Sequence, residues 1–247
     1  FATDIVQQET LSATITQDSV WGPQLQDALR DLPSISLVMP GTLAEEQEAK
    51  ASVEMIFPNG DSGFQVDAGI AYGGNTHSHY VKRTFDVEFR GIYGASTLTF
   101  DLFGDGATRE FDRLILRSGS HDSLFFAHRG TANRGVYIRN RWTSDRQLEM
   151  GHPAPHGRFV HLYWNGTYWG QYHLMERPNA AFMASYFGGD KADYDALNAG
   201  VVVDGTDEAW LGLLEATDDY DVLQHYLDLT NYADYMLLNF SGGNNWL

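Results

Sequence analysis

The chain has 247 residues, of which 43% are hydrophobic and 13% aromatic, and this composition is typical of a folded globular protein with a substantial core. The formal net charge of −17 opposes direct binding to nucleic acids and to anionic membranes, since both are negatively charged. The absence of cysteine excludes disulfides, thiolate metal sites and a cysteine nucleophile, and no apolar run approaches the ~20 residues of a membrane span.

Residues 1–31 are polar and acidic, and we expect them to form a peripheral arm. The following hundred residues contain short apolar or alternating runs, separated by Pro, Gly and Asn, which are typical of β-strands. A glycine-rich stretch containing Gly73 and Gly74 interrupts them. Strands are predicted at residues 33–39, 53–57, 64–70, 84–89, 98–100 and 113–117.

From residue 132 onward the pattern favours helices. Apolar residues at helical spacing predict a helix within 132–150 that carries several Arg on one face. A β-hairpin is predicted at 159–175, with Asn165-Gly166 as its turn. Gly170 lies inside its second strand, where a glycine often marks a bulge or a close backbone approach. Further helices are predicted at about 179–187, 190–197, 207–216, 219–227 and 231–239.

The hairpin region contains the most specific motif of the chain. It reads N-G-x-Y-x-G-x-Y-x-x-x-E from Asn165 to Glu176, and Glu176 stands where the strand leads into a helix. This arrangement resembles the signature of the spore-coat-protein-H (CotH) kinase family, a group of atypical, secreted protein kinases. Other segments resemble CotH domains of the planctomycete type in the family's order, and they lie at residues 32–38, 64–85, 116–122, 137–139, 150–153 and 231–239.

The resemblance and the order of elements together imply an α+β, two-lobed, atypical protein-kinase-like fold with a β-rich first half and a helical second half. The expected parts are the arm (1–31), a β-rich N-lobe (32–131) and a C-lobe of hairpin plus helices (132–247), both lobes forming one domain. Because the chain ends within a polar loop, we expect it to be C-terminally truncated.

By resemblance, the function is phosphate transfer from ATP, with Mg²⁺, to Ser or Thr of an exported or cell-surface partner, in an extracytoplasmic location. Phosphoryl transfer requires cationic groups on the phosphates and a residue that orients the attacking hydroxyl. The nucleotide-binding residues that the resemblance implies are Gly73, Gly74, Lys82, Arg139 and Glu176.

Each of these residues also has a structural interpretation that the sequence leaves open. Lys82 could be a solvated lysine at a strand edge, and the two glycines could form a plain turn. Arg139 could pair with Asp122 or Glu149. Glu176 could pair with Arg177 or with an arginine that bridges the lobes.

The last residues depart from the family pattern. The family loop reads Gly-Asn-x-Asp-Trp or similar, whereas here it reads Gly-Gly-Asn-Asn-Trp and has Asn245 where Asp is expected. Asn244 and Asn245 therefore occupy the candidate catalytic positions, and an amide cannot accept a proton as a carboxylate does. This substitution favours an alternative function, a non-catalytic CotH-like structural or interaction module of a larger surface or extracellular assembly. A carbohydrate-binding β domain is a third hypothesis, favoured only by the aromatic content.

The sequence predicts no metal site formed by protein ligands alone. The pairs His77/His79 and His152/His156 lack a third ligand at a defined spacing, as zinc would require. The run from Asp101 to Gly106 has the wrong oxygen spacing for a calcium-binding EF-hand loop.

Overall fold

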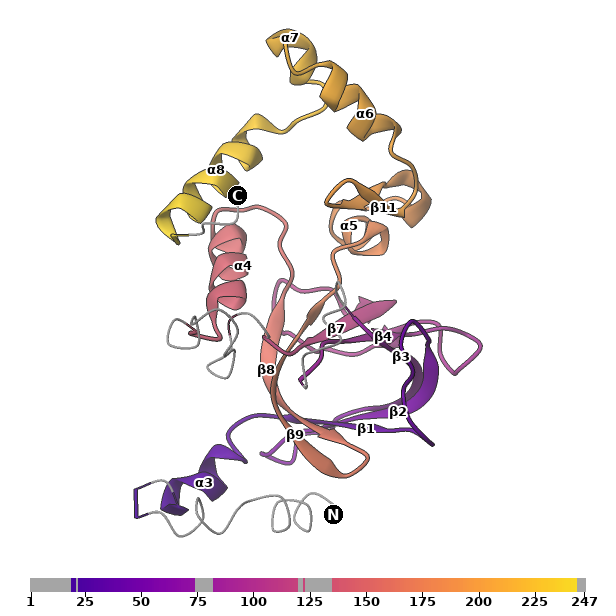
Figure 1. Cartoon of the computed structure of the whole chain (residues 1–247), viewed down its shortest axis with the longest axis vertical. Helices are drawn as coiled ribbons and strands as arrows, with labels where there is room; N and C mark the ends of the chain where they lie inside the picture. The colour runs from indigo at the N-terminus through magenta and orange to yellow at the C-terminus, as the bar shows by residue number, and fades with distance from the viewer. Residues whose placement is uncertain (1–18, 21, 74–81, 120–121, 123–134, 244–247) are drawn as a thin grey trace. The chain divides into compact units, whose positions relative to one another are not determined.

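The computed structural model describes residues 19–20, 22–73, 82–119, 122 and 135–243 (Figure 1). The chain divides into two compact units. The first comprises Phe1–Asp105, Arg109–Tyr137 and Gly157–Met175, and the second comprises Gly106–Thr108, Ile138–His156 and Glu176–Leu247. The predicted domain boundaries after residues 31 and 131 stay predictions.

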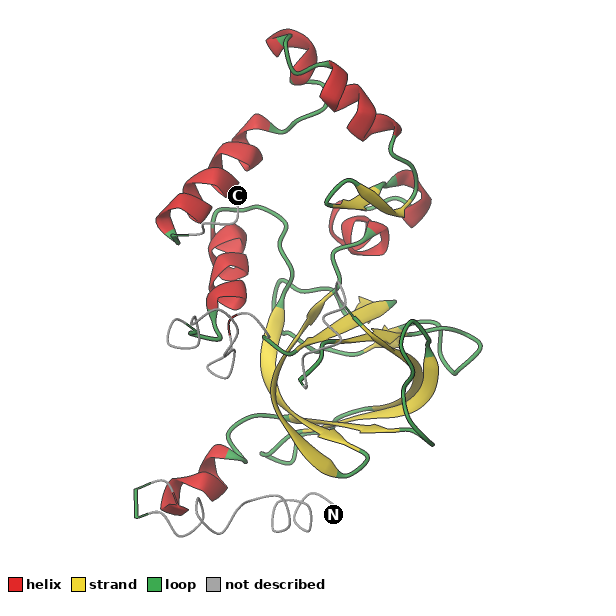
Figure 2. Ribbon diagram, viewed as in Figure 1, coloured by secondary structure: helices red, strands yellow, loops and turns green. Residues whose placement is uncertain are grey.

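The first unit is built on a closed β-barrel (Figure 2). The strand order is β1-β2-β3-β4-β7-β9-β8, and β1 pairs in parallel with β8, from Ser34↔His161 to Leu37↔Trp164. The barrel strands are β1 (Ser34–Val38), β2 (Ala49–Ile56), β3 (Gln65–Tyr72), β4 (Phe85–Glu88), β7 (Arg113–Arg117), β8 (Gly157–Trp164) and β9 (Thr167–Glu176). The unit also contains helix α3 (Gly22–Ala28) and a two-stranded sheet of β5 (Leu98–Thr99) and β6 (Glu110–Phe111).

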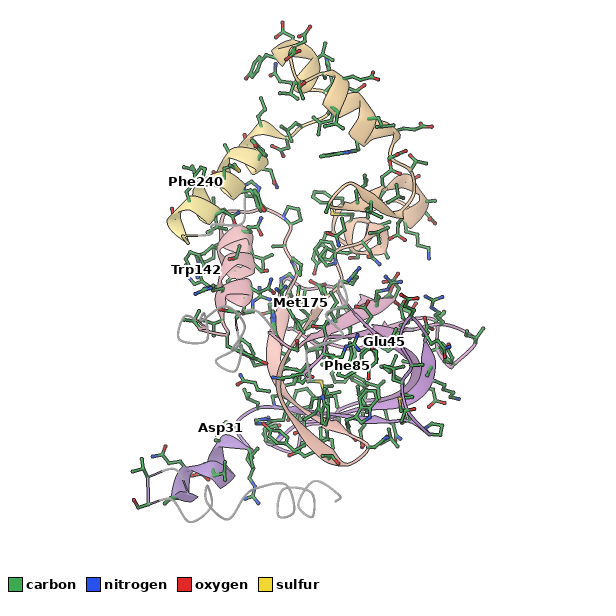
Figure 3. The ribbon with its side chains drawn as sticks, viewed as in Figure 1. Asp31, Glu45, Phe85, Trp142, Met175 and Phe240 are labelled. Atoms are coloured by element: carbon green, nitrogen blue, oxygen red, sulfur yellow. The ribbon has the colours of Figure 1, made fainter. Side chains whose placement is uncertain are left out.

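The interior of the barrel is the main hydrophobic core. In β2 the residues Ala51, Val53 and Met55 are buried and alternate with more exposed neighbours, as expected for a strand with one face toward a core. Phe85 points into the barrel, where its ring stacks on Trp164 with a centroid distance of 4.8 Å (Figure 3). The alternation of apolar residues that predicted the strands therefore also predicts which residues form this core.

The second unit contains mainly short helices. Its elements are α4 (Arg139–Glu149), α5 (Ala180–Phe187), a 3₁₀ turn η4 (Lys191–Asp193), strands β10 (Ala196–Asn198) and β11 (Val201–Asp204), α6 (Glu208–Glu215), α7 (Tyr220–Leu223) and α8 (Leu229–Ser241). Side-chain caps fix the starts of α5, α7 and α8, where Asn179, Asp219 and Asp228 accept hydrogen bonds from backbone N–H groups of the first turn. Helices α4 and α8 contact each other. None of the helices in the described ranges is both long and apolar enough to cross a membrane.

The predicted fold class is wrong. The chain is β-rich, with a closed seven-stranded barrel and few helices, and does not form a two-lobed kinase-like fold with a helical second half. The physical reason is the parallel pairing of β1 with β8, which brings the hairpin of the second half into the same sheet as the strands of the first half. The predicted helix at 190–197 is also wrong, because Ala196–Asn198 pairs as a strand with the β-branched run Val201–Asp204.

Candidate functional site

Lys82 lies just before β4 in the first unit, and its ammonium group meets residues from two distant parts of the chain. Its Nζ donates to the Tyr137 hydroxyl and to the Gln171 carbonyl, each at 2.5 Å. The same nitrogen lies 4.8 Å from the centroid of the Tyr137 ring and 4.6 Å from that of Tyr172. Lys82 is therefore held by carbonyl, phenol and aromatic groups, an environment that we call the Lys82 pocket, and the alternative of a solvated strand-edge lysine does not describe it.

No carboxylate in the described part of the chain balances the charge of Lys82. Lys82 forms no ion pair with any residue that the structure describes. Burial disfavours its charged form and lowers the pKa of Lys82 to about 8. Burial also raises the pKa of Tyr137 and of Tyr172, so both phenols stay neutral beside the lysine.

Tyr137 connects Lys82 to the barrel. Its hydroxyl donates to the Ser118 carbonyl at 2.7 Å and also contacts the Gln171 carbonyl. Tyr137 has a positive φ of 63°, a conformation that is uncommon for a residue with a side chain. Tyr137 lies in the segment 137–139 that resembles the family, but the sequence predicts no role for it. Nothing in its local pattern indicates a contact with Lys82, which is 55 residues away in the chain.

Gly170 provides space for the lysine. A Cβ at this position would lie 3.5 Å from Lys82 Cε and 3.6 Å from Nζ, and its φ of 106° is one that residues with side chains rarely adopt. The β8–β9 register shifts beside it, between Leu162 and Tyr163, so of the two interpretations of this glycine the bulge is confirmed. The neighbouring Tyr172 donates its hydroxyl to the Arg83 carbonyl at 2.9 Å. One glycine and one tyrosine of the signature, Gly170 and Tyr172, thus lie against Lys82.

Gly73 has a packing requirement of its own. A Cβ there would lie 2.8 Å from Asp86 Oδ1, closer than real Cβ contacts, and the Gly73 N–H donates to the Thr84 carbonyl at 2.9 Å. The close approach to Asp86 therefore accounts for a glycine at this position. Gly74 lies outside the described residues.

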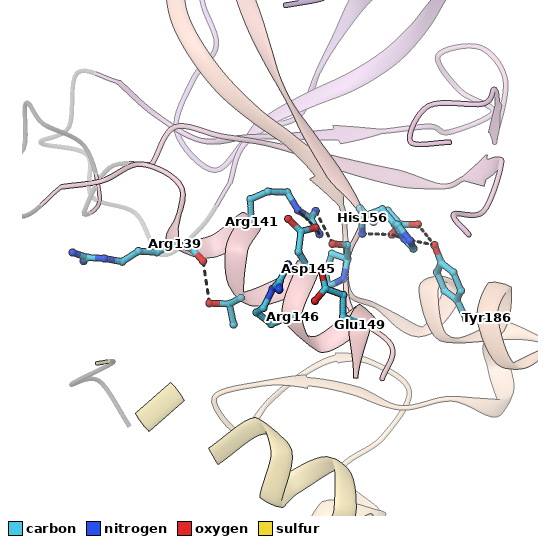
Figure 4. A network of polar contacts seen from close by, with 10 residues as sticks. Arg139, Arg141, Asp145, Arg146, Glu149, His156 and Tyr186 are labelled. Carbon is cyan, nitrogen blue, oxygen red and sulfur yellow. Dashed lines mark hydrogen bonds and ion pairs between the residues drawn. The ribbon is translucent and has the colours of Figure 1, made fainter. Parts of the chain in front are cut away.

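Arg139 is the first residue of α4, in the second unit, and its side chain is exposed. Figure 4 shows this side chain pointing away from the other labelled residues of the helix. Arg141, also in α4, has a side chain that is only 11% exposed, and it pairs with Asp145 at 2.7 Å and donates to the Pro155 carbonyl at 2.9 Å. Glu149, one of the two alternative partners considered for Arg139, forms an ion pair with Arg146.

Glu176 is 2% exposed and both of its carboxylate oxygens are hydrogen-bonded (Figure 4). Oε2 accepts from the His156 backbone N–H at 2.6 Å and lies 3.1 Å from His156 Nδ1, while Oε1 accepts from the Tyr186 hydroxyl at 2.7 Å. Tyr186 in turn accepts from the Thr108 N–H at 3.1 Å. Among the described residues, Glu176 therefore bonds to His156 and Tyr186, and the alternative interpretation, a pairing with an arginine, is not seen there.

The structure brings Lys82 and Gly73 into the first unit and Arg139 and Glu176 into the second. Asn244, Asn245, His77 and His79 lie outside the described residues. His152 pairs with Asp234 at 2.7 Å, and Asp101 pairs with Arg109. Within the described ranges, no group of three or more His, Asp or Glu side chains is arranged to hold a metal ion.

Comparison with known proteins gives one family match. The model of the family described as "CotH kinase protein" matches residues 70–244, a range that contains Lys82, Tyr137 and the whole β8–β9 hairpin. A search of curated proteins finds none that matches this chain.

Proposed function

The chain belongs to the CotH kinase family, and from this membership we propose that it forms an atypical protein kinase domain. It would transfer the terminal phosphate of ATP to Ser or Thr hydroxyls of an exported or cell-surface protein, outside the cytoplasm. The observation that carries the proposal is Lys82, a half-buried cation without a carboxylate partner among the described residues.

The geometry around Lys82 supports a role on a phosphate. An ammonium group has three N–H donors, and the described residues accept from two of them, at Tyr137 and Gln171. The third has no acceptor among the described residues, and we propose that an anion takes this place. A phosphate oxygen beside Lys82 would favour the charged form and raise its lowered pKa again, so the cost of burying the charge would be offset when the nucleotide binds.

The other nucleotide-binding residues are proposed from the family alone. Gly73 and Gly74 would let the backbone approach phosphates, Arg139 would contribute a second cation, and Glu176 would contact the adenosine part of the nucleotide. ATP supplies the phosphoryl group when bound, with Mg²⁺ as the counter-ion that the family implies.

A second candidate function rests on Asn245. If an amide occupies the position of the expected proton acceptor, the domain would bind nucleotide without transferring phosphate efficiently. The chain would then serve as a structural or interaction module of a surface or extracellular assembly.

Calorimetry with ATP and Mg²⁺ tests the nucleotide site. We expect weak, Mg²⁺-dependent binding that Lys82→Ala weakens at least tenfold, whereas Lys50→Ala, which removes an exposed cation paired with Asp67, leaves the affinity unchanged. Unchanged affinity in Lys82→Ala would remove this lysine from the site.

Phosphate transfer distinguishes the two functions. Labelled phosphate incorporation is measured into the protein itself and into a Ser/Thr peptide library, with and without Asn245→Asp. A general base contributes ~10²–10⁴-fold, so the kinase function predicts a clear gain from Asn245→Asp if position 245 is the base position. ATP binding without transfer by either form supports the non-catalytic module.

A further inference from the structure

The first unit contains a hollow that shares no residue with the Lys82 pocket. Its volume is 490 Å³, within the range of small-molecule sites. Phe57, Phe100 and Phe103 supply aromatic lining, Arg158 supplies a cation, and Ser62 and Asp101 contribute oxygen atoms. Phe57 directly follows the last residue of β2, and Gly73 directly follows the last residue of β3. Because β2 and β3 are antiparallel, the hollow lies at the opposite end of these two strands from Gly73.

Arg158 is the polar group that gives this hollow its chemistry. Its Nη1 donates to the Leu102 carbonyl at 3.2 Å, and its guanidinium carbon lies 5.2 Å from the centre of the Phe57 ring. It is half-buried, and burial lowers its pKa. No carboxylate among the described residues pairs with it. The remaining donors of its planar fork therefore have no protein acceptor in the described part of the chain.

The carboxylates that line the same hollow are already engaged. Asp101 accepts from the Gly104 N–H at 3.1 Å through Oδ1 and pairs with Arg109 at 2.7 Å through Oδ2. Asp61 accepts from the Asn59 side-chain amide at 2.7 Å. Arg158 is the cation among the described lining residues, and it lacks a described partner of opposite charge, although the chain as a whole carries −17. Asp61 also lacks one, because Asn59 is neutral, but its carboxylate is exposed and already hydrogen-bonded.

We propose that this hollow binds a small organic carboxylate with an aromatic or aliphatic body. The carboxylate would accept two parallel hydrogen bonds from the Arg158 guanidinium, whose fork matches its geometry. The body would replace water against Phe57, Phe100 and Phe103. A bare inorganic anion would use the guanidinium alone and leave the aromatic lining wet, so the lining favours the organic ligand. The proposal does not depend on the proposed kinase function.

Ligand binding is tested by NMR titration of the whole chain with phenylacetate as the probe, compared with benzyl alcohol and with inorganic phosphate. For a ligand of this size we expect a dissociation constant of the order of 1 mM. Phenylacetate should bind at least tenfold more tightly than the other two compounds. Equal binding of benzyl alcohol, or tighter binding of phosphate, would overturn the proposal.

Two variants and a matched control locate the site. Arg158→Gln should weaken phenylacetate binding at least tenfold, and Arg30→Gln, which removes the same charge at an exposed position of the same unit, should not. Because Arg158→Gln also removes the bond to Leu102, Ser62→Trp provides a second variant that fills the hollow and retains Arg158. If a folded Ser62→Trp protein binds phenylacetate as well as the parent does, the hollow is not the binding site.

Discussion

Lys82 is a cation held where its charge is costly. Two hydrogen bonds, to Tyr137 and Gln171, and two aromatic faces do not replace the hydration that burial removes, and the pKa of Lys82 falls to about 8 as a result. If this position served only the stability of the fold, an apolar side chain would fill it without the free-energy cost of burying a charge. Retaining a charged lysine here is expected where the charge serves binding or catalysis.

Lys82→Met should therefore stabilise the protein. The Met side chain is similar in length and carries no charge, and Tyr137 still contacts the Ser118 and Gln171 carbonyls. A pKa lowered from 10.5 to about 8 corresponds to at most about 3 kcal/mol at 1.36 kcal/mol per unit, so we expect a gain of about 1–3 kcal/mol at pH 7, measured by urea denaturation. Lys50→Met, at an exposed ion pair, should change stability by less than about 0.5 kcal/mol.

The pH dependence of this gain has a definite sign. Between pH 8 and 10.5 the unfolded chain retains the Lys82 proton that the folded protein has lost, so the stability of the parent rises with pH in this window. The advantage of Lys82→Met is complete below pH 8 and shrinks as the pH rises toward 10. An advantage that is constant from pH 7 to pH 10 would contradict the burial cost assigned to Lys82.

At the scale of the element, the structure of the β8–β9 hairpin accounts for most residues of the motif that runs from Asn165 to Glu176. Asn165 and Gly166 form the turn with positive φ values of 47° and 80°. Tyr168 places its hydroxyl 3.0 Å from His161 Nδ1 across the hairpin, and burial raises the pKa of this tyrosine to about 12. Gly170 and Tyr172 then shape the space around Lys82. The motif therefore encodes a bulged strand that holds a lysine.

Gly170→Ala tests this interpretation. The new methyl group would require a φ of 106° and would contact the end of Lys82, so we expect a loss of about 1–3 kcal/mol in unfolding free energy and weaker ATP binding. Gly91→Ala is the matched control, because a Cβ there meets nothing within 4 Å and its φ is not in the positive range. Equal effects of the two substitutions would show that Gly170 has no special conformational role.

The sequence predicts local features well and long-range pairing poorly. Alternation of apolar residues is sufficient to locate the barrel strands, and Asn165-Gly166 and Gly170 are recognisable as turn and bulge from their own conformational preferences. The pairing of Ser34 with His161 joins segments more than a hundred residues apart, and no local pattern encodes it. The sequence does not predict the partners of Glu176 for the same reason, since His156 and Tyr186 become neighbours of Glu176 only in the folded chain.

At the scale of the whole molecule, the negative charge is distributed unevenly along the sequence. Residues 192–247 contain eleven Asp and Glu and neither Lys nor Arg, so this stretch contributes −11 of the total of −17. Any anionic ligand of Lys82 must approach a strongly anionic protein. Long-range repulsion and short-range attraction therefore act in opposite directions on ATP.

Ionic strength separates these two contributions. The Debye length is about 30 Å at 0.01 M salt and about 8 Å at 0.15 M, so added salt first screens the repulsion from the whole chain and leaves the contact with Lys82 largely intact. We expect the association rate constant for ATP to rise several-fold between 0.01 and 0.15 M NaCl at constant Mg²⁺, measured by stopped-flow fluorescence, while that of uncharged adenosine stays constant. A steady fall over the same range would mean that nearby cations outweigh the charge of the whole chain, and the phosphate site would then need more positive charge than Lys82 alone supplies.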